Sequence, residues 1–243
     1  MAPKKKPKTP AAPRKVQAPK QRGDSSGGGP SSRTMLYVAG GIVVVALVAA
    51  GGLFAFAGSS SGGDKHVASL MEAAGCNYKT VRAYVPPGQG VHVNSLTKNF
   101  PWNTDPPSNG QHYPLWAVWG FYTQPVNPRM VVHNQEHGGV ILWWGTNVPA
   151  STVDQLRSFY NEQPDGTFGT PYAKLGSKVA ISAWTGDPAK YTQNGYYGQG
   201  HLAICPRLDG ATLKAFEAFR NAYRGKGPEG IPLSLDEPGM GPQ

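Results

Sequence analysis

The sequence has few cysteines and few acidic residues, and neither type is spread evenly along the chain. The two cysteines, Cys76 and Cys205, form no CxxC pair, so their spacing does not support redox chemistry or soft-metal ligation. Residues 1–33 contain nine of the 23 Lys and Arg but one of the 14 Asp and Glu, which leaves the rest of the chain almost neutral. The net charge of +9 therefore belongs to the amino-terminal tail, and it does not indicate that the rest of the chain binds nucleic acid.

Motifs of common catalytic machinery are absent as well. The sequence contains no G-x-S-x-G nucleophile motif, no phosphate-binding glycine loop, no dinucleotide fingerprint after a predicted strand and no internal repeat. These absences argue against a serine hydrolase and against a nucleotide-dependent enzyme. They favour a binding function over an enzymatic one.

The longest apolar run covers residues 35–57 (MLYVAGGIVVVALVAAGGLFAFA), which contain no charge. About 20 apolar residues cross a bilayer as a helix, so we expect one transmembrane helix here. The basic tail before it and the Gly/Ser-rich linker over 58–63 after it predict a cytoplasmic amino terminus and an extracytoplasmic carboxy-terminal domain. The tail over 1–34 is rich in Pro, Lys, Ala, Ser and Gly, and we expect it to be disordered.

Two features of this region leave alternatives open. Ala55 and Ala57 fit the small-x-small pattern of a signal-peptidase site, so the apolar segment could be a cleaved secretory signal, although it is longer than the usual signal core. The basic run over 4–8 could bind anionic lipid or nucleic acid instead of serving only as an orientation signal.

The predicted location outside the cytoplasm bears on the two cysteines. In an oxidising compartment Cys76 and Cys205 can form one disulfide, which would join the start of the outer domain to a position near its end. A bridge that closes a loop of more than ~100 residues is worth about 4–5 kcal/mol in the chain-entropy model. Metal ligation or redox chemistry is the alternative use of these thiols.

Short helices and strands alternate without a strict βαβ rhythm across the outer domain. Caps and apolar periodicity predict helices over 64–74, capped by Asp64, over 151–162, opened by Ser151 with Asp154, and over 211–223, capped by Asp209. The predicted strands cover residues 78–85, 91–94, 139–144 and 178–184. A long irregular segment over 98–129 carries many aromatic residues and turn signals.

The densest polar cluster covers residues 133–139 (HNQEHGG) and lies between two apolar segments. His133 and His137 are four residues apart, which places both imidazoles on one face of either a helix or a strand. Two imidazoles in this arrangement can share one Zn or Cu ion. We expect His112 to supply a third ligand, and Glu136 to be a ligand or to orient one.

Other uses of the same residues remain open. Further candidate ligands are His92, His201 and, for Cu(I), Met130. The polar residues could instead cap backbone groups in a loop before the buried strand, with Glu136 paired to Arg129 or Arg82. The spacing also matches H-x-x-E-H of the inverted zinc metallopeptidases, but that motif needs a helix that continues, whereas Gly138 and a strand-like run follow.

Two segments of the chain resemble one known family. Residues 105–122 (DPPSNGQHYPLWAVWGFY) and 133–139 resemble domain-of-unknown-function family 3105, whose bacterial and archaeal members often carry one amino-terminal membrane segment. The resemblance covers about residues 75–223, and Asn109 departs from the family pattern. It implies no established activity. Positions that match the family pattern include His112, His133, Glu136 and His137, which implies that these residues act together.

We therefore predict an α+β fold in which one compact extracytoplasmic domain over 64–226 follows a single transmembrane helix and precedes a flexible tail over 227–243. The domain should contain a small mixed or antiparallel sheet and about three helices. The predicted function is a membrane-anchored binding domain with a His-rich site for Cu or Zn. The alternatives are a non-enzymatic accessory subunit that docks its aromatic loop on another envelope protein, and a hydrolase whose metal activates water.

Overall fold

The computed structural model describes residues 60–242. The predicted cytoplasmic tail and transmembrane helix lie outside these residues. No helix within 60–242 has both the length and the apolar character needed to cross a membrane. The described residues form an α+β domain with a five-stranded mixed sheet and four α-helices, one helix more than the sequence predicted.

The sheet has a mixed topology with β4 at its centre. The strand order is β1 (Asn77–Arg82), β5 (Gln199–Cys205), β4 (Val179–Thr185), β2 (Val140–Trp144) and β3 (Thr167–Pro171). Strands β2 and β3 are parallel, and the other neighbouring strands are antiparallel. Every residue of β2 is buried because both faces of the sheet are covered, which explains its uninterrupted apolar sequence.

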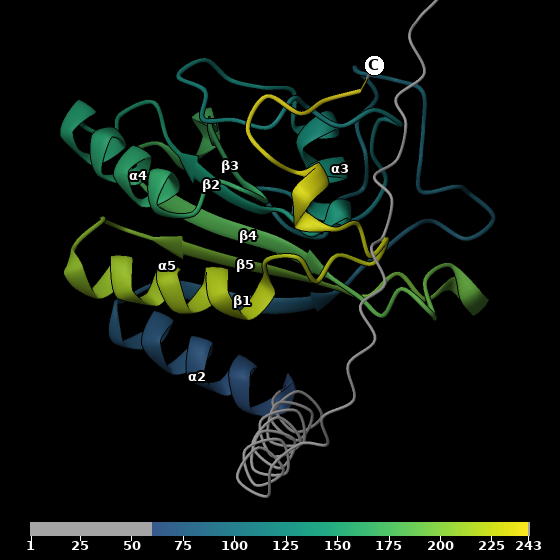
Figure 1. The fold of residues 1–243 in the computed structure, drawn as a ribbon, viewed down its shortest axis with the longest axis horizontal. Coiled ribbons are helices and arrows are strands. Elements are labelled where there is room, and N and C mark those ends of the chain that lie inside the picture. Colours follow the sequence, from purple (N-terminus) through teal and green to yellow (C-terminus); the bar gives the residue numbers. More distant parts are fainter. Residues whose placement is uncertain (1–59, 243) are drawn as a thin grey trace, which may run out of the picture. The chain divides into compact units, whose positions relative to one another are not determined.

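The two faces of the sheet carry different kinds of structure (Figure 1). The helices are α2 (Ser60–Ala73), α3 (Pro128–His137), α4 (Ala150–Glu162) and α5 (Gly210–Tyr223). Helices α2, α4 and α5 pack on one face, where Leu142 and Ile181 contribute to the apolar core. The alternate residues Ile141 and Ala180 point to the other face, which α3 covers together with the long irregular segment before it.

Helices α4 and α5 lie where the sequence predicted them, but only one of their predicted caps is correct. Asp209 caps α5, because its carboxylate accepts a hydrogen bond from the Thr212 N–H at 2.9 Å. The predicted Ser151 cap is wrong, since α4 begins one residue earlier, after Pro149, and has no side-chain cap.

Other element predictions need larger corrections. Helix α2 begins at Ser60 and includes Asp64, so it takes in part of the predicted linker. The strand predicted over 91–94 is reduced to one isolated bridge between His92 and His112. Helix α3 and strands β3 and β5 were not predicted.

The chain after α5 is a packed part of the domain, although the sequence predicts a surface tail from residue 227. Gly227 crosses α3 so closely that a Cβ atom on it would lie 2.3 Å from the carbonyl oxygen of Glu136, and only glycine fits there. Asp236 is fully buried. Further along, the Trp119 N–H donates a hydrogen bond to the Met240 carbonyl at 2.8 Å.

The predicted disulfide between Cys76 and Cys205 is present, and its two ends lie 129 positions apart in the sequence. Cys205 ends β5 inside the apolar core, and Cys76 precedes the paired strand β1. The bridge therefore joins two neighbouring strands of the sheet that are far apart in the sequence.

Removing this bridge should lower the free energy of unfolding by about 4–5 kcal/mol, because the unfolded chain regains the freedom of a long loop. We expect the double variant Cys76→Ala/Cys205→Ala to show this loss in denaturant unfolding. A reductant should destabilise the wild-type protein by a similar amount and leave the variant unchanged. Equal stability of the oxidised and reduced wild-type protein would show that the bridge contributes nothing.

Candidate metal centre

Helix α3 carries the candidate site, and the local sequence fixes both of its ends. Asn127 caps the amino end by accepting a hydrogen bond from the Arg129 N–H at 3.1 Å, and Pro128 follows as the first helical residue. Gly138 ends the helix in the left-handed conformation with φ of 114°. Residues 133–137 therefore lie on the last turn of a helix, which is one of the two structures that the spacing of His133 and His137 allowed, and not in the loop of the alternative interpretation.

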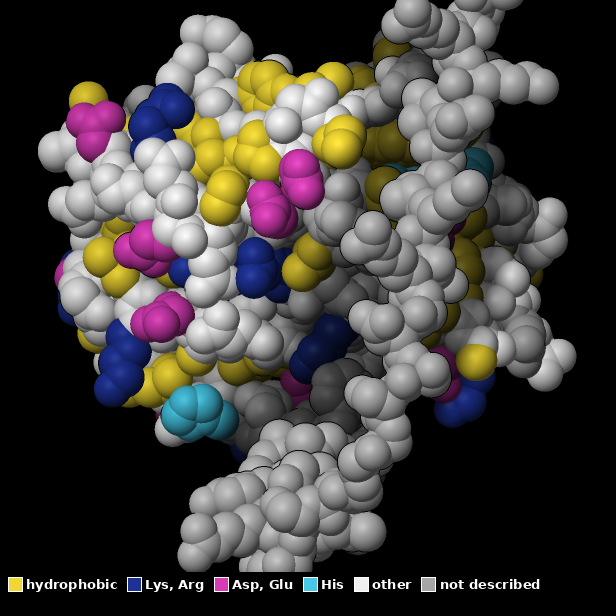
Figure 2. Space-filling view, in the orientation of Figure 1, with side chains coloured by type: hydrophobic (Ala, Val, Ile, Leu, Met, Phe, Trp, Pro, Cys, Tyr) yellow, Lys and Arg dark blue, Asp and Glu magenta, His cyan; other side chains and the backbone are white. Residues whose placement is uncertain are grey.

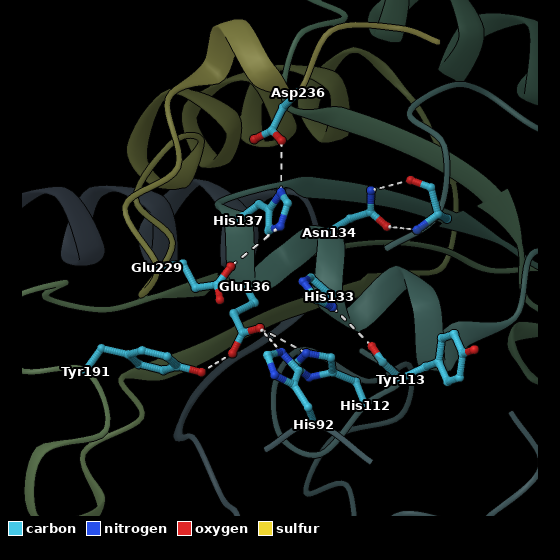
Figure 3. Close-up of polar contacts among 11 residues, drawn as sticks. His92, His112, Tyr113, His133, Asn134, Glu136, His137, Tyr191, Glu229 and Asp236 are labelled. Atoms are coloured by element: carbon cyan, nitrogen blue, oxygen red, sulfur yellow. Dashed lines mark hydrogen bonds and ion pairs between the residues drawn. The ribbon is translucent and has the colours of Figure 1, made fainter. Parts of the chain in front are cut away.

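Two buried side chains hold this turn of α3 in place. Asn134 pairs with the backbone of Ala117 through two hydrogen bonds of 2.9 Å, one donated by each residue (Figure 3). Gln135 donates to the Pro107 carbonyl at 3.0 Å and accepts a hydrogen bond from the Ser182 hydroxyl at 3.0 Å. The helix is thus tied both to the irregular segment and to β4, which fixes the direction of its other side chains.

Backbone pairing brings two further histidines to the same place. The Val93 N–H donates to the His112 carbonyl at 2.8 Å, and the His112 N–H donates to the Val91 carbonyl at 3.0 Å. This short parallel bridge sets His92 beside His112. The next residue, Tyr113, donates its N–H to the first turn of α3, so both histidines lie against the helix.

Three imidazoles surround the carboxylate of Glu136 (Figure 3). The ring centroids of His92, His112 and His133 lie 4.8–4.9 Å apart. The Nε2 atoms of His92 and His112 lie 3.0 and 2.9 Å from Oε2 of Glu136. Tyr191 donates its hydroxyl hydrogen to the other oxygen, Oε1. One donor atom from each histidine and from the carboxylate can be chosen so that all four lie within 4.8 Å of one another.

The hydrogen bonds behind the rings direct lone pairs into this cluster. The Nδ1–H of His112 donates to the Gly110 carbonyl at 2.8 Å, and that of His133 donates to the Tyr113 carbonyl at 3.1 Å. A neutral imidazole has one N–H, so when these two rings are neutral, Nε2 of each carries a lone pair. Among the described residues, Nε2 of His112 has no hydrogen-bond partner, although it lies 2.9 Å from an oxygen of Glu136. A lone pair this close to a carboxylate requires a cation between them, either a proton or a metal ion.

A second group of possible ligands adjoins the first on α3. The Nδ1–H of His137 donates to the buried Asp236 carboxylate at 3.1 Å, and its Nε2 lies 3.5 Å from Oε2 of Glu229. Donor atoms of His133, His137 and Glu229 again lie within 4.8 Å of one another. Both carboxylates come from the segment after α5. A carboxylate behind an imidazole is a common support for a metal-ligating histidine.

Burial and neighbouring charges set the protonation of the cluster. Burial, together with His112, lowers the pKa of His133 to about 3, so its ring is neutral near neutral pH. Burial alone would raise the pKa of Glu136, but its contacts with His112 and His92 hold that pKa below its usual value. Glu136 is therefore an ionised carboxylate with no exposed side-chain surface, and such a charge needs a positive partner.

The structure divides the residues that the sequence proposed as ligands. His112, His133 and Glu136 lie together, whereas His137 belongs to the adjoining group. His92, a further candidate in the sequence, completes the first group. The residues at the site that the sequence did not identify are Tyr191, Glu229 and Asp236.

The other candidates lie elsewhere. Met130 packs against the apolar cluster between α3 and the sheet. His201 lies on β5, on the sheet face that α5 covers. The guanidinium group of Arg129 donates to two loop carbonyls instead of pairing with Glu136.

Comparison with known proteins identifies the family. The family model described as a protein of unknown function (DUF3105) matches residues 92–231, which include every residue of both ligand groups. The chain belongs to this family. Searches of curated proteins and of solved structures find no match. Membership confirms the resemblance seen in the sequence, and it places both groups within the family domain without assigning an activity.

His201 forms a separate buried network among hydroxyl groups. Its Nδ1 lies 3.1 Å from the Thr80 hydroxyl, and its Nε2 lies 2.8 Å from the Thr185 hydroxyl. The ring stacks on Tyr223 with 4.0 Å between centroids. Burial lowers the pKa of His201 to about 4, because none of these hydroxyl partners compensates a positive charge.

This lowered pKa predicts a loss of stability in mild acid. An unfolded histidine has a pKa of about 6.5, so below that pH the unfolded chain binds a proton that the folded protein does not bind until about pH 4. Stability from this residue is present above about pH 6.5, and about 2 kcal/mol of it should be lost by about pH 5. Denaturant unfolding at about pH 7.5 and pH 5 should show a smaller decrease in His201→Gln than in the wild-type protein. An equal decrease in both proteins would assign the acid sensitivity to other groups.

Proposed function

We propose that this protein is a membrane-anchored, extracytoplasmic domain that binds a transition-metal ion. Glu136, His92 and His112 are the ligands in this proposal, and His133 completes the set. The observation that carries it is the pair of Nε2 atoms that approach one carboxylate oxygen at 2.9 and 3.0 Å. Two ligands of a tetrahedral zinc ion lie about 3.3 Å apart, so these side chains need to move only slightly to accept an ion.

Groups behind the ligands support this proposal. The carbonyls of Gly110 and Tyr113 accept hydrogen bonds from the Nδ1–H groups of His112 and His133. Nε2 of each ring is then free to bind a metal. The Tyr191 hydroxyl holds the carboxylate through its other oxygen. Such partners fix the orientation of ligands before an ion arrives, and metal sites commonly contain them.

The donor atoms favour Zn²⁺ or Cu²⁺ over Cu(I). Both groups of candidate ligands offer imidazole nitrogen and carboxylate oxygen. The two cysteines are joined to each other, and Met130 packs in an apolar cluster. Nitrogen and oxygen ligands suit borderline divalent ions, whereas sulfur ligands select Cu(I).

The proposed location rests on the sequence and on the bridge. The apolar run over 35–57 follows a basic tail, and a disulfide is typical of an oxidising compartment. Lys and Arg side chains are interspersed with Asp and Glu on the surface that Figure 2 shows. The expectation that the folded domain does not bind nucleic acid rests on the nearly neutral charge of the chain after residue 33.

Docking on an envelope protein is the second candidate function, and the aromatic loop gives it little support. Trp119 is buried against Phe168, and Phe121 stacks on Trp144. These rings are used inside the domain and are not free to contact a partner. Leu115 and Val118 of the same segment are exposed, and a partner can reach these two side chains.

Metal retention tests the proposed function. The purified full chain in detergent is stripped with a chelator, loaded with Zn²⁺ or with Cu²⁺, and passed over a desalting column before metal analysis. We expect the wild-type protein to retain metal and His112→Ala to retain about one ion per chain less, because the variant lacks a buried ligand. His66→Ala is the matched control, since His66 is exposed on α2.

Folding is checked by circular dichroism, so that a loss of metal in His112→Ala is not confused with unfolding. The proposal would fail if the wild-type protein retained neither Zn²⁺ nor Cu²⁺. The cation between His112 and Glu136 would then be a proton. The proposal would also fail if the folded His112→Ala variant retained as much metal as the His66→Ala control.

The proposed topology has its own test. Alkaline phosphatase fused after residue 243 should be active, because it folds outside the cytoplasm, and a green fluorescent protein fused there should not fluoresce. Deleting residues 35–57 should reverse both results. The mass of the purified chain separates an anchor, which keeps the basic tail, from a signal cleaved after Ala57. Fluorescence of the full-length fusion would contradict the proposed orientation.

A further inference from the structure

We infer that the domain binds two divalent cations side by side. The first ion is bound by His92, His112 and Glu136, and the second by His133, His137 and Glu229. The inference rests on the proposed function, because it adds a second ion next to the first.

The number of free lone pairs is the first reason for two ions. The Nδ1–H of His133 is committed to the Tyr113 carbonyl, so this ring has one nitrogen for one metal ion. Both groups of candidate ligands contain His133. When a single ion is present, His133 is its fourth ligand. When a second ion binds, His133 becomes a ligand of that ion, and the first ion keeps the other three ligands. Each ion then has two imidazoles and one carboxylate, which is the ligand set of open zinc sites.

The surroundings of His137 are the second reason. Its Nδ1–H donates to the buried Asp236 carboxylate at 3.1 Å, so in the neutral ring Nε2 carries the lone pair, which points away from Asp236. That Nε2 lies 3.5 Å from Oε2 of Glu229, which is long for a hydrogen bond but close to the spacing of two ligands on one tetrahedral ion. The ring of Trp116 packs against both His133 and His137 and keeps their orientations.

The placement of the two groups makes the ions neighbours. His133, Glu136 and His137 come from one turn of α3, and Glu229 comes from the segment that crosses this turn. Two-metal sites in other proteins hold their ions about 3.5–4 Å apart, a separation that one helical turn can provide.

Each group also has one ligand at the solvent boundary. The side chain of His92 is 38% exposed and that of Glu229 is 25% exposed, whereas the remaining ligands are buried. Each ion can therefore arrive through its own outer ligand. The carboxylates of Glu136, Glu229 and Asp236 lie against two divalent ions and leave one positive charge, so the open positions favour a bound hydroxide or another small anion.

Counting bound ions tests the inference. The full chain in detergent is stripped with a chelator, given excess Zn²⁺, freed of unbound metal by gel filtration, and analysed for zinc per chain. We expect two zinc ions in the wild-type protein and in the His66→Ala control. We expect one in His137→Ala/Glu229→Gln, which loses the second group, and one in His92→Ala/His112→Ala, which loses the first. The conservative single variant Glu229→Gln, which keeps the shape of the side chain, should also hold one.

The possible counts separate the two proposals. One zinc per wild-type chain that disappears in His92→Ala/His112→Ala would support the proposed function and overturn the second ion. No zinc in the wild-type protein would overturn both. Two zinc ions that persist in both Glu229→Gln and His137→Ala/Glu229→Gln would show that the second ion lies elsewhere. Circular dichroism establishes that each variant is folded before its zinc is counted.

Replacement with Co²⁺ tests whether the two ions are neighbours. Cobalt ions held about 3.5–4 Å apart interact magnetically, so the electron paramagnetic resonance signal per cobalt should be weaker in the wild-type protein than in His137→Ala/Glu229→Gln. An equal signal per cobalt in the two proteins would contradict a pair of adjacent ions.

Discussion

The ionised carboxylate of Glu136, buried with no exposed side-chain surface, is the constraint around which the irregular half of the domain is built. Burying such a charge without compensation costs several kcal/mol. Three separate segments supply its partners: His92 and His112 precede α3, and Tyr191 lies between β4 and β5. The segment after α5 closes the other side, where the Glu229 N–H donates to the carbonyl of Glu136. The need to compensate the Glu136 carboxylate thus explains why segments without regular structure take defined positions around it.

One face of the sheet carries the apolar core that stabilises the domain, and the other face carries the candidate site. The face covered by α2, α4 and α5 is an apolar core, and the disulfide joins the two strands at its edge. The opposite face carries Ser182, whose hydroxyl accepts from Trp143 and donates to Gln135 of α3. A rigid sheet therefore positions a polar helix, and the loops around that helix bring the candidate ligands to it, as is common for functional sites.

The sequence predicted the parts whose signals are local. The uninterrupted apolar run of β2 and the Asp209 cap of α5 are of this kind. Helix α3 also had local signals, because Asn127 and Pro128 form a typical start and Gly138 a typical end. It was missed because its buried residues include the polar run over 133–137, so no apolar stripe reveals it. The partners of His137 could not be found locally, since Asp236 lies 99 residues away in a segment whose composition resembles a tail.

The position of His133 has a consequence for how the two ions would affect each other. Its single free nitrogen belongs to both groups, so an ion in the second group removes a ligand from the first. In the two-ion arrangement that we infer, the groups compete for this ligand, and each ion lowers the affinity for the other by the same factor. The first ion can keep His133 until the second arrives, which makes the first bind more tightly. We therefore expect the ion at Glu136 to bind first and more tightly, and the ion at Glu229 to bind second and more weakly.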